Sequence, residues 1–317
     1  MRKGYLLVLL IIITINFFLP RLMPGDPFLY LSVEDGNVSS TFSEEQIVQY
    51  KTYYGLDKPL AAQYLSYLAK LARGDLGYSI YFNTSVLGII TSRVPWTIFI
   101  VLTSLLLSSL IGVSAGVVSA WLRGKPADTL LYSGMILLSE IPAFLLGVLL
   151  LFIFAAKLRW FPLSGGVSPF LSFSSNFDYL KDLLNHAALP VITLTLTRLG
   201  GFYLLSRNSM LTVIAKNFMT TARAKGLKKS RILFRHALRN ALPPIITRIF
   251  MSLGTLFGGA VLIENVFNYP GIGRLMREAV VVRDYVLIEG IFLFITVTVL
   301  LMNFLADAVH KKFDPRV

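Results

Sequence analysis

Six long apolar runs dominate the pattern of hydrophobic and polar positions along this chain. They cover residues 5–23, 96–121, 129–156, 187–206, 243–263 and 285–306. Each is near or above the ~20 residues that a helix needs to cross the hydrocarbon of a bilayer. Backbone polar groups inside lipid must pair within their own segment, which favours helices. The pattern therefore predicts an all-α membrane protein with six transmembrane helices.

The longest polar segment, residues 24–94, has a helical pattern of its own. A helix start at Ser43 leads toward Tyr54, and Tyr and Leu recur at helical spacing between residues 61 and 71. Residues 74–77, Gly-Asp-Leu-Gly, are typical of a turn. We expect a small external helical segment after the first transmembrane helix. It either caps the membrane surface or serves only to pack.

The distribution of charge predicts how the chain is inserted. One set of connecting segments holds 16 Lys and Arg and two acids in 57 residues: 1–4, 122–128, 207–242 and 308–317. The other set holds 12 Lys and Arg and 12 acids in 126 residues: 20–94, 157–186 and 264–284. Basic loops favour the cytoplasmic side, so we expect both termini in the cytoplasm. The net charge of +13 then follows from topology, and no nucleic-acid partner is expected.

The first apolar run has two interpretations. Arg2 and Lys3 precede it, as in a secretory signal peptide. No small-residue cleavage site follows, however, and the chain continues into a Pro-Gly-Asp-Pro turn at 24–27, so an uncleaved helix fits better. The predicted parts are a first transmembrane helix (1–23), an external region (24–94) and a five-helix core (95–317) that contains a basic loop (207–243).

Composition removes several kinds of chemistry from consideration. The 317 residues include no cysteine, which excludes disulfides and cysteine nucleophiles, and the three histidines lie far apart in sequence. Gly124-Lys125 is followed by Pro126 and lacks the upstream glycine of a phosphate-binding loop. A mean hydropathy of +0.67 leaves no room for a large soluble domain. We expect no catalytic residue, no metal site and no ATP bound by this chain.

The basic loop, residues 207–243, has the pattern of two helices around a turn. Gly226 is placed to end the first helix in a left-handed conformation, and Ser230 is a candidate N-cap for the second. Pro243-Pro244 is expected to mark the change of direction into the fifth span. Three arginines recur every fourth residue on one face of the second helix: Arg231, Arg235 and Arg239.

Two interpretations of this loop remain open on physical grounds. A basic amphipathic helix can lie on anionic lipid headgroups. Alternatively, the two helices dock into a groove on a cytoplasmic partner. Small residues at Ala222, Ala224 and Gly226 would then let the partner approach closely.

Residues of this loop carry a resemblance to a known family. T-A-R-A-K-G-L at 221–227, followed by R-H-A-L-R-N-A-L-P at 235–243, resembles the cytoplasmic "EAA" loop of ABC importer permeases of the peptide/nickel class. Further motifs match in order along nearly the whole chain. These are P-G-D-P-F (24–28), Y-G-L-D-K-P-L (54–60), G-D-L-G (74–77), E-x-V-F-x-x-P-G-I-G (264–273) and D-P-R (314–316).

The resemblance implies a type I ABC importer permease fold and a multi-pass subunit of a bacterial or archaeal inner membrane. Such subunits pair with a second homologous permease and are driven by two cytoplasmic ABC ATPase subunits, which bind ATP and Mg²⁺. An extracytoplasmic substrate-binding protein delivers the ligand. In that family the loop forms a coupling helix seated in the ATPase. The corresponding positions here are Thr221, Ala222, Arg223, Ala224, Lys225, Gly226 and Leu227.

Two positions depart from the family pattern. Thr220 stands where the motif has its glutamate, and Glu140 stands where relatives usually have a small hydroxyl residue. Intramembrane ionisable residues are functional candidates, and Pro142 is expected to kink the helix. Glu140 and Pro142 are therefore our pathway candidates, with pairing of Glu140 to a neighbouring polar group as the alternative. Other charged residues, expected to snorkel from span ends, are Arg198, Arg248 and Glu289.

The ligand is left open at this point. Peptides, nickel, opine–metal complexes and glutathione are all taken up by importers of this class. A pathway lined by Glu140 would favour a cationic or amine-bearing substrate. The alternative function is a membrane anchor or scaffold subunit that has no pathway of its own.

Overall fold

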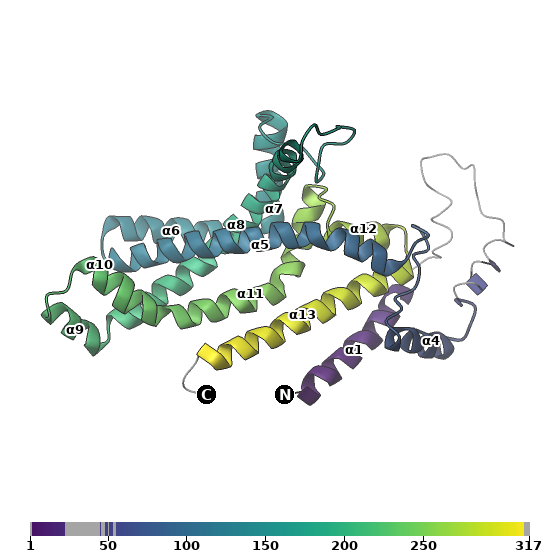
Figure 1. Cartoon of the computed structure of the whole chain (residues 1–317), viewed down its shortest axis with the longest axis horizontal. Helices are drawn as coiled ribbons and strands as arrows, with labels where there is room; N and C mark the ends of the chain where they lie inside the picture. Colours follow the sequence, from purple (N-terminus) through teal and green to yellow (C-terminus); the bar gives the residue numbers. More distant parts are fainter. Residues whose placement is uncertain (1, 23–44, 46–47, 50, 53–54, 314–317) are drawn as a thin grey trace. The chain divides into compact units, whose positions relative to one another are not determined.

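The chain folds into helices in the computed structural model, which describes residues 2–22, 45, 48–49, 51–52 and 55–313. Within these ranges there is no strand, only one isolated bridge between Tyr78 and Ser85. The helices (Figure 1) are α1 (Arg2–Arg21), α4 (Leu60–Ala72), α5 (Val86–Trp121), α6 (Pro126–Glu140), α7 (Ala143–Leu150), the π-helical η2 (Leu151–Lys157), α8 (Asn176–Ile214), α9 (Asn217–Ala224), α10 (Lys229–Arg231), the π-helical η3 (Ile232–Leu238), α11 (Arg239–Val266), α12 (Ile272–Val281) and α13 (Tyr285–Phe313).

Within the described residues the predicted apolar runs are helical, apart from a break at 141–142. Among the described residues, three helices are long and apolar enough to cross a membrane: α5, α8 and the 285–308 part of α13. A fourth results if α6 and α7–η2 count as one span, although they meet at an angle of 96°. The remaining two predicted spans coincide with α1 and α11. An all-α membrane fold is confirmed, with three or four spans by this criterion against the six predicted.

Some helix ends differ from the limits of the apolar runs. Helix α5 begins at Val86, upstream of the run at 96–121, and α8 extends beyond 187–206 at both ends. Apolarity marks only the part of a helix that lipid surrounds, whereas polar turns can continue the same hydrogen-bond ladder. The second helix predicted in the polar segment is confirmed as α4. The one expected between Ser43 and Tyr54 lies largely outside the described residues.

The chain divides into two compact units, which we describe separately. Unit 1 comprises Met1–Pro95 and Gly271–Thr298, and unit 2 comprises Trp96–Pro270 and Val299–Val317.

Unit 1 has an apolar core formed by the start of α5, α12 and the first turns of α13. Val86 and Ile90 of α5 pack there with Leu275 of α12 and Leu287 of α13. Asp284 caps α13: its carboxylate accepts from the Leu287 and Tyr81 backbone N–H groups, each at 3.0 Å. Burial raises the pKa of Asp284.

Unit 2 has two apolar cores. The first joins α5, α7, α8 and α11, for example through Leu105, Leu146, Phe202 and Ile263. The helices approach closely at glycines, as small residues allow in membranes. At Gly200 of α8, an added Cβ would lie 2.6 Å from a backbone oxygen of α6. The second core lies beneath the basic loop and is described with it.

Candidate functional site: the basic loop and the α6–α7 break

The basic loop is built on the ends of α5 and α8. One face of α9 and η3 is turned inward and forms the second core of unit 2. The residues of this core are Val117, Ala120, Met210, Val213, Met219, Ala222, Ile232, Leu233, Ala237 and Ala241. The loop is therefore folded into helices, as the sequence pattern predicted, and it packs on the ends of α5 and α8.

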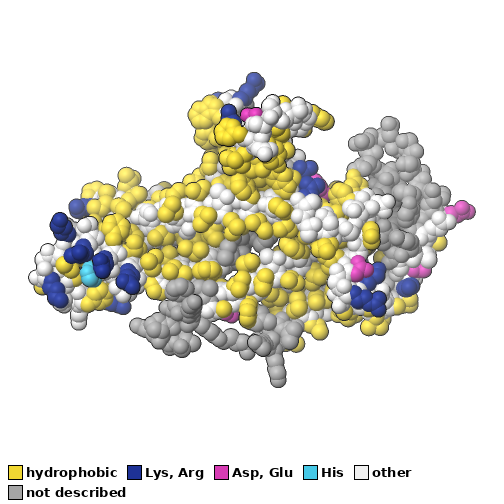
Figure 2. Space-filling model, viewed as in Figure 1, with side chains coloured by type: hydrophobic (Ala, Val, Ile, Leu, Met, Phe, Trp, Pro, Cys, Tyr) yellow, Lys and Arg dark blue, Asp and Glu magenta, His cyan; other side chains and the backbone are white. Residues whose placement is uncertain are grey.

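The opposite face of the loop is basic and exposed. Of the residues matched to the coupling motif, Thr221, Arg223, Ala224, Lys225 and Gly226 are exposed and Leu227 is half-buried. The three arginines at 231, 235 and 239 are exposed as well. In Figure 2, Lys and Arg side chains gather over the region of α9 and α10, at the left of the view. This face is suited to an acidic partner surface.

Gly226 makes the turn between the two helices, as predicted. Its φ is +68°, a conformation that suits glycine, and its N–H donates to the carbonyl of Arg223 at 3.0 Å. A shallow hollow of about 650 Å³ begins at this glycine. It is lined by Gly226, Leu227, Lys228, Ser230, Arg231, Phe234 and Arg235. Phe234 is 62% exposed, so an apolar ring stands among the basic groups.

Three details of the loop differ from the sequence prediction. The second helix begins at Lys229, which places Ser230 inside the helix and removes it as a cap. Pro243-Pro244 lies inside α11, and the helix runs on through both prolines. Ala222 is buried in the loop's own core and does not offer its small side chain to a partner.

The third predicted span is broken next to Glu140. Helix α6 ends at this residue, Ile141 is extended with ψ 121°, and Pro142 leads into α7. Residues before proline avoid the helical region, which explains the break. Glu140 is exposed and makes no hydrogen bond or ion pair within the described part of the chain. Its carboxylate therefore stands at a 96° bend inside an apolar segment.

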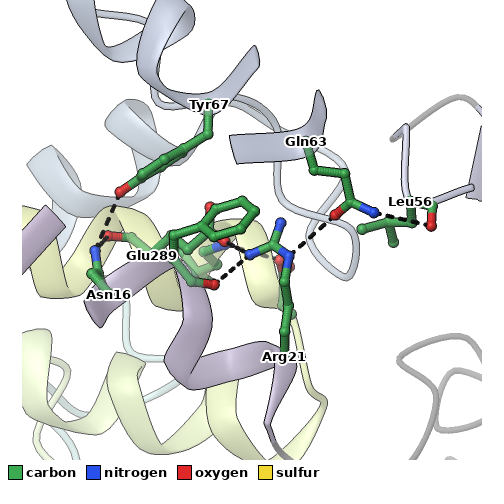
Figure 3. A network of polar contacts seen from close by, with 9 residues as sticks. Asn16, Arg21, Leu56, Gln63, Tyr67 and Glu289 are labelled. Atoms are coloured by element: carbon green, nitrogen blue, oxygen red, sulfur yellow. Dashed lines mark hydrogen bonds and ion pairs between the residues drawn. The ribbon is translucent and has the colours of Figure 1, made fainter. Parts of the chain in front are cut away.

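Glu289 does not snorkel from its span, so that prediction was wrong. It is 6% exposed and pairs with Arg21 of α1 within unit 1. Figure 3 shows Arg21 between Glu289 and Gln63, whose Oε1 accepts from Nε of Arg21 at 3.1 Å. Asn16 of α1 donates to the Glu289 carbonyl at 2.8 Å. These bonds hold α1 against α13 and α4.

A second buried ion pair, which sequence reasoning missed, joins Asp128 of α6 and Arg207 of α8. The charge distribution assigns Asp128 to the connecting segment 122–128, yet it is 5% exposed. Its partner lies 79 positions along the chain. A charged residue in the first turn of a helix beside an apolar run was the only available signal.

Known protein families match nearly the whole length of this chain. Residues 112–317 match the family described as binding-protein-dependent transport system inner membrane component, and residues 2–101 match the N-terminal region of the same kind of component. The chain belongs to this family. The match confirms the resemblance that the motifs carried.

Curated relatives of this permease cover nearly its whole length. A Brucella ovis protein named as a peptide permease is 37% identical over 316 residues, covering 99% of this chain and 95% of the relative. The di/tripeptide transport system permease protein DppB of Pseudomonas aeruginosa is 33% identical, covering 100% and 97%. The oligopeptide transport system permease protein AppB of Bacillus subtilis is 34% identical, covering 98% and 95%.

A solved structure shows the same fold. A chain of the MetNI methionine ABC transporter, in an inward-facing conformation, superimposes with a TM-score of 0.56 at 17% identity. The match covers 72% of this permease and 97% of that chain. The predicted type I ABC importer permease fold is thus confirmed.

Proposed function

We propose that this permease forms half of a translocation pathway for peptides and that the basic loop connects the pathway to an ATPase. The exposed basic face of the loop carries this proposal. It is folded, it is anchored on α5 and α8, and its exposed residues include most of the coupling motif. The curated relatives with peptide-transport names support peptides over nickel or metal chelates as the ligand.

The proposed mechanism is mechanical. ATP and Mg²⁺ stay with two ATPase subunits in the cytoplasm, and an extracytoplasmic binding protein delivers the peptide. Partners that bind one conformation more tightly shift the permease between outward-open and inward-open states. A second homologous permease completes the pathway. The basic loop moves with the ATPase pair, and the rigid helices behind it carry that motion into the membrane.

Glu140 has a proposed role in this pathway. Its carboxylate is exposed at the α6–α7 bend and has no partner within the described residues. Unpaired charge inside a membrane is costly unless it meets water or an opposite charge. The ammonium group of a peptide N-terminus supplies such a charge.

The test of the docking claim uses two substitutions at one position. Gly226→Pro is incompatible with the observed φ of +68°, since proline fixes φ near −65°. Gly226→Asn tolerates this conformation, and an added Cβ meets nothing within 4 Å. We expect Gly226→Pro to insert normally but to import peptide poorly per ATP hydrolysed, with Gly226→Asn close to the parent. Coupled transport by Gly226→Pro at the parent level contradicts the claim.

The test of Glu140 is Glu140→Gln, which keeps the shape and removes the charge. Import of a mixture of isotope-labelled di-, tri- and tetrapeptides in proteoliposomes should fall, while assembly with the ATPase subunits is unchanged. The parent should import peptides with a free N-terminus faster than N-acetylated ones. In the Glu140→Gln variant this difference in import rate should disappear. If Glu140→Gln imports peptides at the parent level and still prefers free peptides to acetylated ones, Glu140 has only a structural role.

A membrane scaffold without a pathway is the competing function. It predicts the same anchoring but no peptide uptake. Reconstitution with the partner subunits separates the two, since peptide uptake that depends on this chain is expected only if the chain forms part of the pathway.

A further inference from the structure

The Asp128–Arg207 pair lies where α5, α6 and α8 meet, at the first residue of the basic loop. Arg207 of α8 donates from Nη2 to Oδ2 of Asp128 at 2.9 Å and from Nε to Oδ1 at 3.1 Å. The exposed fractions of the two side chains are 16% for Arg207 and 7% for Asp128. A bidentate Arg–carboxylate pair of this kind, called the fork below, fixes the relative orientation of the two side chains as well as their distance.

Helix α5 joins this pair through a hydroxyl. Ser119 donates to Oδ1 of Asp128 and accepts from Nε of Arg207 at 3.0 Å. Tyr203 lies 2.6 Å from the same hydroxyl, and it must be the donor because Ser119 gives its one proton to Asp128. The Tyr132 ring of α6 lies 5.0 Å from the guanidinium carbon of Arg207. Ser119 and Tyr203 are fully buried.

Net stability does not explain such a cluster. Removing two charges from water costs about as much as their attraction returns, and well-packed apolar residues often stabilise a site equally well. The cluster differs from an apolar contact in being directional. An apolar interface lets helices slide or rotate, whereas the fork and the shared hydroxyl lose bonds on small displacements.

The positions of these residues connect the loop with the α6–α7 break. Arg207 lies on α8 just before the loop helices, and Ser119 lies between Val117 and Ala120, which belong to the loop's core. Asp128 lies in the first turn of α6. The last residue of α6 is Glu140, roughly 20 Å away at 1.5 Å per residue.

We propose that Asp128 and Arg207 are positioning residues that transmit displacement of the basic loop to α6 and thereby to Glu140. This inference rests on the proposed function. Helix α8 moves with the loop because they share a core, the fork makes the start of α6 follow α8, and the rigid α6 carries the movement to the break. All these contacts lie within unit 2.

Conservative variants separate this role from a structural one. Asp128→Asn keeps the shape and removes the charge, and Arg207→Lys keeps the charge but lacks the fork. Asp128→Asn breaks a buried pair and should lower the amount of complex, so rates are compared per assembled complex in proteoliposomes. On that basis we expect both variants to hydrolyse ATP at rates within about twofold of the parent. Peptide imported per ATP, measured with the same labelled peptide mixture, should fall about tenfold, a size typical of coupling between sites.

Glu289→Gln is the matched control, because it breaks a buried ion pair in unit 1. A purely structural pair lowers the amount of complex and both rates together, so the import-to-hydrolysis ratio is unchanged. We expect this for Glu289→Gln and not for Asp128→Asn or Arg207→Lys.

The outcomes distinguish the two proposals. If Gly226→Pro leaves the ratio unchanged, the proposed function of the loop fails. If Gly226→Pro lowers the ratio but Asp128→Asn and Arg207→Lys do not, only the positioning role fails. Failure of both conservative variants to assemble also overturns it, since a positioning role requires a folded complex that is poorly coupled.

Discussion

Buried charges in this permease are held by partners from distant parts of the sequence. Glu289 lies within α13 and meets Arg21 of α1, 268 positions away. Arg21 in turn is held by the Gln63 side chain and lies over the Phe17 ring at 3.6 Å. Each partner removes part of the cost of placing a charge in an apolar environment. Arg198 on α8 is a contrast, because its Nη1 is buried without a hydrogen bond to any described residue.

Loss of the Glu289 carboxylate should lower stability markedly. Glu289→Gln leaves Arg21 buried and without its counter-charge, and breaking such a pair costs about 3–5 kcal/mol. Glu278→Gln is the control in the same unit, since the Glu278–Arg274 pair is about a quarter exposed and such pairs contribute about 0–1 kcal/mol. Thermal unfolding in detergent measures both. Equal unfolding midpoints for the two variants would contradict the larger contribution of the Glu289–Arg21 pair to stability.

Helices of unit 2 are held at close distance by glycines. Gly200 of α8 faces Ser139 and the Met135 carbonyl of α6, and an added Cβ would lie 2.6 Å from that carbonyl oxygen. The break between α6 and α7 also depends on a single residue. Pro142 forces Ile141 out of the helical region of backbone conformation.

Adjacent glycines give a direct test of this packing. Gly200→Ala places its methyl group against α6 and should destabilise by about 1–3 kcal/mol, the usual cost of overpacking. At Gly201 an added Cβ meets nothing within 4 Å, and alanine there should be neutral or slightly stabilising. Unfolding midpoints of the two variants measure the difference. If only Gly201→Ala loses stability, the close contact between Gly200 and α6 is contradicted.

At the scale of the whole molecule, the sequence predicted the helical membrane fold because hydrophobic runs and turn residues are local signals. The turn at Gly226 and helix α4 followed from spacing and glycine chemistry for the same reason. The fork between Asp128 and Arg207 was not predictable, since it depends on how α5, α6 and α8 pack. The prediction that Glu289 snorkels was wrong for the same reason, because its partner is determined by tertiary structure and not by its neighbours in sequence.

The most direct test of the central claim uses the absence of native cysteines. A single cysteine at the exposed Lys225, or at Trp160 in the loop before α8, is labelled in cells with a photo-crosslinking maleimide. We expect Lys225→Cys to capture a subunit that contains a phosphate-binding loop and to be protected from impermeant maleimide. We expect Trp160→Cys to be labelled from outside and to capture no ATPase. Capture of the ATPase from Trp160→Cys, or labelling of Lys225→Cys from outside, contradicts that claim.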